Sequence, residues 1–133
     1  MVERWFALLE NPSAEPETLN DLLAKSPFDL RLEGELLRDR DGLVAWVARL
    51  RAIYPQIAYA LGPIQIQSEA SDRYRVQLEF DRHASDAAGL PHVARREQTW
   101  VVRSDTNGTS VILSIEEKPL LFYSGTGPQI VCY

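Results

Sequence analysis

Hydrophobic and polar residues alternate strictly from Tyr74 to Phe80, where every second position is apolar. A period of two places all the apolar side chains on one face, which predicts a half-buried β-strand. The runs Gln98–Arg103 and Ser110–Ile115 have the same pattern and predict two further strands. Asn107-Gly108 lies between these two runs and predicts a two-residue hairpin turn, because both positions accept a positive φ. The C-terminal half is therefore predicted to form an antiparallel sheet.

The predicted turns fix a register for these strands. A turn centred on Asn107-Gly108 places apolar residues opposite apolar residues and one acidic residue opposite a basic one, an arrangement that stabilises paired strands. A three-residue connection, Ala70-Ser71-Asp72, keeps the apolar faces together in the preceding hairpin. The predicted pairs are Val102 with Leu113, Trp100 with Ile115, Glu97 with Lys118, Ile66 with Val76, and Ile64 with Leu78.

The first 55 residues have helical rather than strand periodicity. We expect one helix that ends at Asn11-Pro12, a second from Pro16 to Ser26-Pro27, and a third from Asp39 or Asp41 to Pro55, with a short strand over residues 28–33. The expected buried stripes are Val2, Trp5, Phe6 and Leu9; Leu19, Leu22 and Leu23; and Leu43, Trp46, Val47, Leu50, Ile53 and Tyr54. Helices followed by a sheet predict an α+β domain with helices laid across one face of the sheet.

Composition narrows the class of protein. A chain of 133 residues is expected to form one domain, residues 1–133. The formal net charge of −5 argues against a nucleic-acid partner. The longest apolar run, Leu43–Ala48, is too short to cross a bilayer, and the N-terminus does not resemble a signal peptide. The single cysteine, Cys132, fits a reducing compartment. The chain is therefore expected to be soluble and cytoplasmic, without a membrane partner.

The order of elements and several local sequence segments resemble the nuclear-transport-factor-2-like superfamily, which includes SnoaL-like polyketide cyclases and ketosteroid isomerases. The resembling segments are 2–9, Glu17–Leu23, Asp41–Trp46 and Tyr54-Pro55. The resemblance implies a cystatin-like cone, in which a curved antiparallel sheet wraps around N-terminal helices.

The resemblance also implies positions for catalytic groups. The tyrosine that family isomerases use as an oxyanion donor matches Trp5, whose indole N–H can donate. Their catalytic aspartate matches a position near Leu32, and strand alternation then predicts that the neighbouring Glu33 faces outward. A steroid-isomerase mechanism is therefore not expected.

Alternation assigns the candidate site to the inner face of the sheet. This face is predicted to carry Val76, Leu78, Phe80, Arg82, Arg96, Gln98, Trp100, Val102, Val111, Leu113, Ile115 and Glu117. Glu117, opposite Gln98 and walled by Phe80 and Trp100, would lose water on one side and is the candidate catalytic base. An arginine beside it would hold it ionised or bind an anionic group of a ligand. The expected ligand-binding residues are Trp5, Phe80, Arg82, Arg96, Gln98 and Trp100. The same residues also fit a salt-bridged strand end without function.

Two functions stay open at this point. The first is binding of a small apolar or aromatic carbonyl compound in an apolar pocket, with isomerisation, cyclisation or dehydration by acid–base chemistry. The second is a non-catalytic domain that dimerises or holds a partner protein. No metal and no cofactor are expected, because two histidines and one cysteine give no ligand cluster.

The resemblance also implies a homodimer through the outer face of the sheet, with Val101 and Ile112 near its centre. The apolar segment Pro119–Tyr123 is expected to cover a neighbour, either the cavity mouth of its own chain or a partner subunit.

Overall fold

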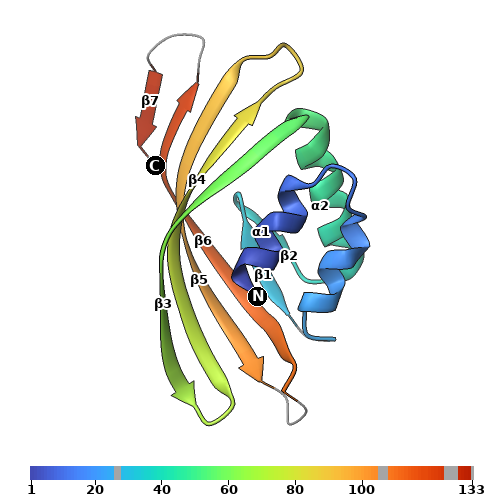
Figure 1. Cartoon of the computed structure of the whole chain (residues 1–133), viewed down its shortest axis with the longest axis vertical. Helices are drawn as coiled ribbons and strands as arrows, with labels where there is room; N and C mark the ends of the chain where they lie inside the picture. Colours follow the sequence, from blue (N-terminus) through green and yellow to red (C-terminus); the bar gives the residue numbers. More distant parts are fainter. Residues whose placement is uncertain (26–27, 105–107, 125–128, 133) are drawn as a thin grey trace.

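The computed structural model describes residues 1–25, 28–104, 108–124 and 129–132. A long curved sheet forms one layer, and the helices lie together against its concave side (Figure 1). The helices are α1 (Val2–Glu10), the 3-10 helix η1 (Pro16–Leu22) and α2 (Arg40–Ile53). The strands are β1 (Asp29–Leu32), β2 (Glu35–Leu37), β3 (Gln56–Ala70), β4 (Arg73–Ser85), β5 (Pro91–Ser104), β6 (Ser110–Ser124) and β7 (Gln129–Cys132).

The described strands form one sheet in the order β2-β1-β6-β5-β4-β3, and β7 pairs with the far end of β6. All neighbours are antiparallel except β1 and β6, which run parallel with Leu30 opposite Ile115. This parallel pairing brings the end of β1 beside the middle of β6. The predicted α+β fold class, with a curved and unclosed sheet around N-terminal helices, is confirmed.

The helices form where the apolar stripes predict them. In α1 all four expected residues are buried, and in α2 the side chain of Asp39 caps the helix by accepting from Gly42 N at 2.6 Å. The second helix is a 3-10 helix instead of a longer α-helix. Ile53 was expected in the buried stripe of α2 but is exposed, and it is the last residue of the helix.

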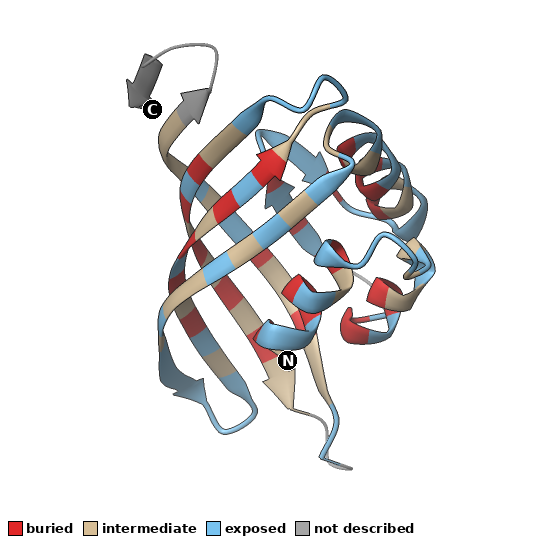
Figure 2. Cartoon of the chain, turned by 45° about the horizontal axis from the view of Figure 1, so that its top comes forward, coloured by how far each residue is buried: buried red, intermediate tan, exposed pale blue. Residues whose placement is uncertain are grey.

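The core lies between the helices and the concave side of the sheet. Figure 2 shows buried positions alternating with exposed ones along the strands, as a half-buried sheet requires. Trp5 of α1 and Trp100 of β5 are fully buried and meet edge to face, with ring centroids 5.8 Å apart. Aromatic pairs in this geometry stabilise beyond their buried area.

Most of the predicted register is confirmed. Trp100 lies opposite Ile115 and Glu97 opposite Lys118. In the preceding hairpin Ile66 lies opposite Val76, and Ile64 opposite Leu78. The predicted turn at Asn107-Gly108 falls partly outside the described residues, which leave out 105–107.

A bulge in β6 overturns part of the predicted inner face. Val101 pairs with Ser114 but Val102 pairs with Ile112, so that Leu113 is an extra residue on its strand. One extra residue reverses the alternation beyond it. Ile112 is therefore fully buried rather than facing outward, whereas Val111 and Leu113, which were expected inside, are half-buried. The predicted pair of Val102 with Leu113 is wrong for the same reason.

The hairpin between β3 and β4 also contains a bulge. Ala70 pairs with Arg73, so the turn has two residues, Ser71-Asp72, instead of the predicted three. Glu69 is an extra residue on β3, because Ser68 on its other side pairs with Tyr74. Both arrangements give the same register further along the strands, which is why the predicted pairs hold.

The segment Pro119–Tyr123 continues β6 and pairs with both β5 and β7. Within the described ranges, no helix is long and apolar enough to cross a membrane.

Candidate active site

Charged side chains replace apolar ones along the inner face of the sheet. On β4 the inward series passes from Phe80 to Arg82, and on β5 it passes from Trp100 through Gln98 to Arg96. The register places Gln98 opposite Glu117 of β6. Four polar side chains from three strands, Arg82, Arg96, Gln98 and Glu117, therefore lie close together beneath the helices.

Glu117 accepts several hydrogen bonds within this group. Its Oε2 accepts from Arg96 Nη1 at 3.0 Å and from the backbone N–H of Glu33 at 2.7 Å, and its Oε1 accepts from Gln98 Nε2 at 3.0 Å. The amide oxygen of Gln98 in turn accepts from Trp100 Nε1 at 2.9 Å. Only 5% of the Glu117 side chain is exposed. A buried carboxylate is tolerated when donors and a positive charge surround it, as here.

Glu33 joins the group, contrary to the outward orientation expected for it. Glu33 and Gly34 have φ values of 53° and 80° and form the two-residue turn between β1 and β2. Two positive φ values define the type I′ turn that favours tight hairpins. The strand alternation that predicted an outward side chain ends at this turn. The Glu33 carboxylate accepts from Arg82, and its Oε1 lies 3.8 Å from Arg96 Nη2.

These polar groups form one end of a cavity whose remaining walls are mostly aromatic and aliphatic. Its lining residues are Trp5, Phe6, Leu9, Leu32, Glu33, Trp46, Tyr59, Phe80, Arg82, Arg96, Gln98 and Glu117. The free volume is only about 10 Å³, about the space that one water molecule needs. The expected apolar pocket is thus almost filled by its own side chains.

Tyr59 of β3 supplies the hydroxyl of the cavity wall. Burial is the main cause that raises the pKa of its phenol far above the usual value, and the negative charge of Glu117 adds to the effect. The phenol therefore keeps its proton over the physiological range and is a hydrogen-bond donor rather than a base.

The structure brings most of the sequence-predicted site residues together. Trp5, Phe80, Arg82, Arg96, Gln98 and Glu117 all line the cavity, and Trp100 contacts it through its bond to Gln98. Two polar residues were missed, Glu33 and Tyr59. The dipeptide Glu33-Gly34 could have indicated a turn, since glycine commonly holds a positive φ. The predicted pairing of β3 with β4 assigns Tyr59 to the outer face, but the bulge between Leu61 and Ile64 turns it inward, opposite Arg82.

A second polar cluster lies further along the inner face. His92 Nε2 lies 2.9 Å from Asp86 Oδ2, and the ring stacks on Phe122 and meets Tyr54 edge to face. The hydrogen bond to His92 is the main cause that lowers the pKa of Asp86. Arg82 also contacts this cluster, because its guanidinium carbon lies 4.9 Å from the centroid of the Tyr54 ring. Among the described residues, no three His, Cys, Asp or Glu side chains gather as a metal site would require.

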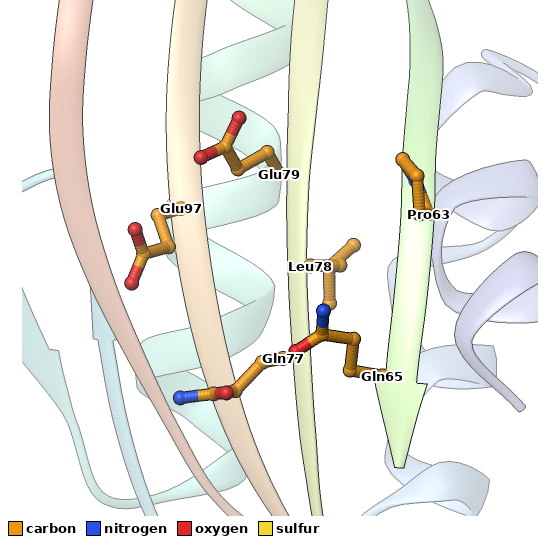
Figure 3. Close-up of a pocket in the computed structure, with 6 residues that line it drawn as sticks. All are labelled: Pro63, Gln65, Gln77, Leu78, Glu79 and Glu97. Carbon is orange, nitrogen blue, oxygen red and sulfur yellow. The ribbon is translucent and has the colours of Figure 1, made fainter.

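The outer face of the sheet has a larger but more open hollow (Figure 3). Its volume is about 290 Å³, and Glu79 and Glu97 extend into it from the neighbouring strands β4 and β5. A bulge at Gly62-Pro63 shapes its edge, where a Cβ on Gly62 would meet the carbonyl oxygen of Glu79 at 3.1 Å. We place the candidate active site in the smaller inner cavity, because there the charged side chains of Arg82, Arg96 and Glu117 are held out of water.

No protein-family model matches the chain, and no curated protein matches it in sequence. Solved structures resemble it closely in shape. A nuclear transport factor 2-like superfamily protein from Salmonella enterica matches with a TM-score of 0.77 and 12% identity over 89% of this chain and 84% of that chain.

Two further structures have names that describe an enzyme. The hexachlorocyclohexane dehydrochlorinase LinA-type3 from Novosphingobium barchaimii matches with a TM-score of 0.80 and 8% identity, over 99% of this chain and 90% of that chain. A candidate scytalone dehydratase from Novosphingobium aromaticivorans matches with a TM-score of 0.76 and 10% identity, over 99% of this chain and 82% of that chain. The TM-scores establish a shared fold, and identities this low establish the fold alone.

Proposed function

Because this chain has the nuclear transport factor 2-like fold, we propose that it binds a small apolar or aromatic carbonyl compound between the helices and the sheet. It isomerises, cyclises or dehydrates that compound by acid–base chemistry without a cofactor. The observation that carries the proposal is the convergence of two carboxylates, two guanidinium groups and an amide at one end of an aromatic cavity. The names of the dehydrochlorinase and the dehydratase among the similar structures denote loss of HCl and of water, which supports acid–base chemistry.

Two carboxylates are candidates for the proton acceptor. Glu117 is the residue expected from the sequence, and three donors already occupy its oxygens. Glu33 is more accessible, with 27% of its side chain exposed, and both of its contacts use Oε1. A general base must come within hydrogen-bonding distance of the proton it removes. The geometry therefore favours Glu33 as the acceptor and gives Glu117 the part of holding Arg96 and the Glu33 backbone in place.

In this proposal, the cations and hydrogen-bond donors of the site stabilise the negative charge that forms when the proton is removed. Removal of a proton beside a carbonyl group leaves negative charge on the carbonyl oxygen, and fixed donors stabilise such an oxyanion more than they stabilise the neutral oxygen. Arg82, Arg96 and the Trp5 indole are the donors that line the cavity. The phenol of Tyr59, which stays protonated, is a further donor.

Hydrogen–deuterium exchange tests the proposal without knowledge of the natural substrate. Wild-type protein in D2O is incubated with a panel of apolar and aromatic carbonyl compounds, and loss of the α-proton signal is followed by NMR. We expect exchange with at least one compound, its loss in Glu33→Gln and Glu117→Gln, and no change in Glu35→Gln. Glu35 is a matched control, because it lies on the same hairpin in an exposed pair with Arg49.

The stability of Glu117→Gln separates function from structure. Because this change leaves the buried Arg96 without its carboxylate, exchange is measured at a temperature where circular dichroism shows the variant to be folded, and a loss of exchange there supports the proposal. A lower melting temperature with unchanged exchange identifies Glu117 as a structural ion-pair partner, and the absence of exchange with every compound contradicts the enzymatic proposal and favours the interaction domain.

We also propose that two copies pair through the outer face of the sheet around Val101, where one patch can meet its own copy across a two-fold axis. Light scattering at micromolar concentration should give the mass of a dimer, and Val101→Lys should give the mass of a monomer. Ile53→Lys is the matched control, since Ile53 is exposed on α2, on the helical side of the sheet. A monomeric wild-type protein contradicts this proposal.

A further inference from the structure

The cavity must gain space before a ligand can enter it. Its free volume of about 10 Å³ compares with about 150 Å³ for a protein cavity that binds benzene. The aromatic and aliphatic walls belong to the packed core and are held by many neighbours. One of the polar side chains is therefore the group that moves aside.

Glu33 is the polar side chain that can leave at the lowest cost. The side chains of Arg82, Arg96 and Glu117 are 5%, 9% and 5% exposed, whereas that of Glu33 is 27% exposed. Glu33 lies at the tip of a two-residue turn and outside the ladder that joins Leu32 to Glu35. Rotation about its side-chain bonds carries the carboxylate to solvent without breaking a strand pair.

The cavity without the Glu33 carboxylate is cationic. The charged groups in its lining are two arginines and two glutamates. With Glu33 turned outward, Arg82 and Arg96 remain against the single charge of Glu117. Arg82 keeps its position over the Tyr54 ring in this state, because that contact does not involve Glu33. The site then has one positive charge in excess beside aromatic walls.

The buried groups of the cavity that have no hydrogen-bond partner are donors, and they need acceptors. Among the described residues, the buried side-chain atoms without a partner include Arg96 Nε and Trp5 Nε1, both on residues that line the cavity, and no acceptor oxygen of a lining residue. Trp5 is fully buried, and nine-tenths of the Arg96 side chain is buried. A buried donor without a partner destabilises the fold, and a ligand with several acceptor oxygens would supply what these two lack.

We propose that the ligand of this cavity is a small aromatic or apolar carboxylate, and that the Glu33 side chain occupies the place of its carboxylate group until it binds. This inference rests on the proposed function, because it assumes that the cavity is the binding site, and it names the class of substrate. The ligand carboxylate takes over the contact with Arg82, which a guanidinium can form with two parallel hydrogen bonds. Glu33 is thereby released from its ion pair close to the bound molecule.

Competition between Glu33 and an added carboxylate gives the test. Benzoate is the probe, and benzamide is its neutral counterpart of nearly the same shape. Calorimetric titration is carried out on wild-type protein, Glu33→Gln, Glu33→Ala, Arg82→Met and the control Glu35→Gln. We expect benzoate to bind wild-type protein weakly and Glu33→Gln and Glu33→Ala at least about tenfold more tightly, which corresponds to a pocket that Glu33 leaves open about a tenth of the time. Benzamide should gain much less, and Arg82→Met should lose benzoate binding.

Several outcomes overturn the inference. Equal binding of benzoate and benzamide by the Glu33 variants shows that charge is not recognised, and equal benzoate affinity in wild-type protein and Glu33→Gln shows that Glu33 does not compete. Circular dichroism verifies the fold, and Glu33→Gln preserves the size of the side chain if Glu33→Ala fails to fold. Deuterium exchange with neutral carbonyl compounds, together with failure to bind benzoate, overturns this inference alone. Benzoate binding as expected, with no compound exchanging, overturns only the catalytic proposal.

Discussion

The two faces of the sheet carry the same kinds of charged residue under opposite conditions. Asp81 and Arg95 are paired across β4 and β5 on the outer face, and the next residues on the same strands, Arg82 and Arg96, point inward. Half of the Arg95 side chain is exposed, whereas the Arg96 side chain is 9% exposed. A shift of one residue along each strand thus moves a charged side chain from the exposed face into the core, where Arg82 and Arg96 pair with Glu33 and Glu117.

The difference lies in what each pair costs the fold. An exposed pair keeps most of its hydration and contributes little to stability. A buried pair loses its hydration, and only close contacts and further hydrogen bonds offset that loss. The inner face has such contacts around Glu117, but it also leaves two donors without acceptors. Replacement of a buried ion pair by apolar side chains of similar volume is often neutral or stabilising, so stability alone does not explain the charges of the inner face.

Removal of one guanidinium from each face should separate the two conditions most strongly. Arg96→Met leaves the Glu117 carboxylate buried without its cation, which should lower the free energy of unfolding by about 3–5 kcal/mol. Arg95→Met, on the neighbouring position, should leave the denaturation midpoint unchanged within error. Urea denaturation measures both variants. Equal midpoints for the two variants would show that the inner pair is as well hydrated as the outer one.

The same comparison explains how far the sequence could predict the structure. Strict alternation identified the inner face of β4 and β5, and so it identified Arg82, Arg96 and Gln98 as site residues. Where an extra residue enters a strand, as at Leu113, alternation fails, and Ile112 was assigned to the wrong face. A bulge of this kind has no composition that marks it, because Val111, Ile112 and Leu113 are all apolar.

Glu33 was missed for a different reason. Glu33 reaches the site because β1 pairs with β6 in parallel, which brings its backbone N–H to Glu117, 84 residues further along the chain. Tyr59 was missed because of another bulge: an extra residue between Leu61 and Ile64 reverses the alternation of β3 and places Tyr59 opposite Arg82. Local periodicity describes which face a residue occupies, but it contains no information about which distant strand lies beside it. The fold class was therefore predictable, whereas the full set of cavity residues was not.

Alkaline pH should reveal the effect of the Tyr59 phenol on stability. The raised pKa of Tyr59 means that the folded protein resists its ionisation. Its contribution to stability is complete below the unfolded value of about 10 and is lost as the pH rises toward the folded value. Tyr59→Phe should therefore lose less stability than wild-type protein between about pH 10 and 12. Urea denaturation over this range is the measurement, and parallel curves for the two proteins would mean that Tyr59 ionises as freely folded as unfolded.

The smallest effect is expected at the outer pair, under acid. The hydrogen bond from Arg95 is the main cause that lowers the pKa of Asp81. A carboxyl with a lowered folded pKa contributes stability above its unfolded value of about 3.9, and the contribution disappears as the pH falls through the folded value. Asp81→Asn should thus differ slightly from wild-type protein at pH 6 and match it at the acid end of the transition. Because this pair lies near the surface, about 1 M salt should also reduce the difference. Denaturation midpoints at two pH values and two salt concentrations give the answer, and a difference that survives both acid and salt would show that Asp81 acts through packing rather than charge.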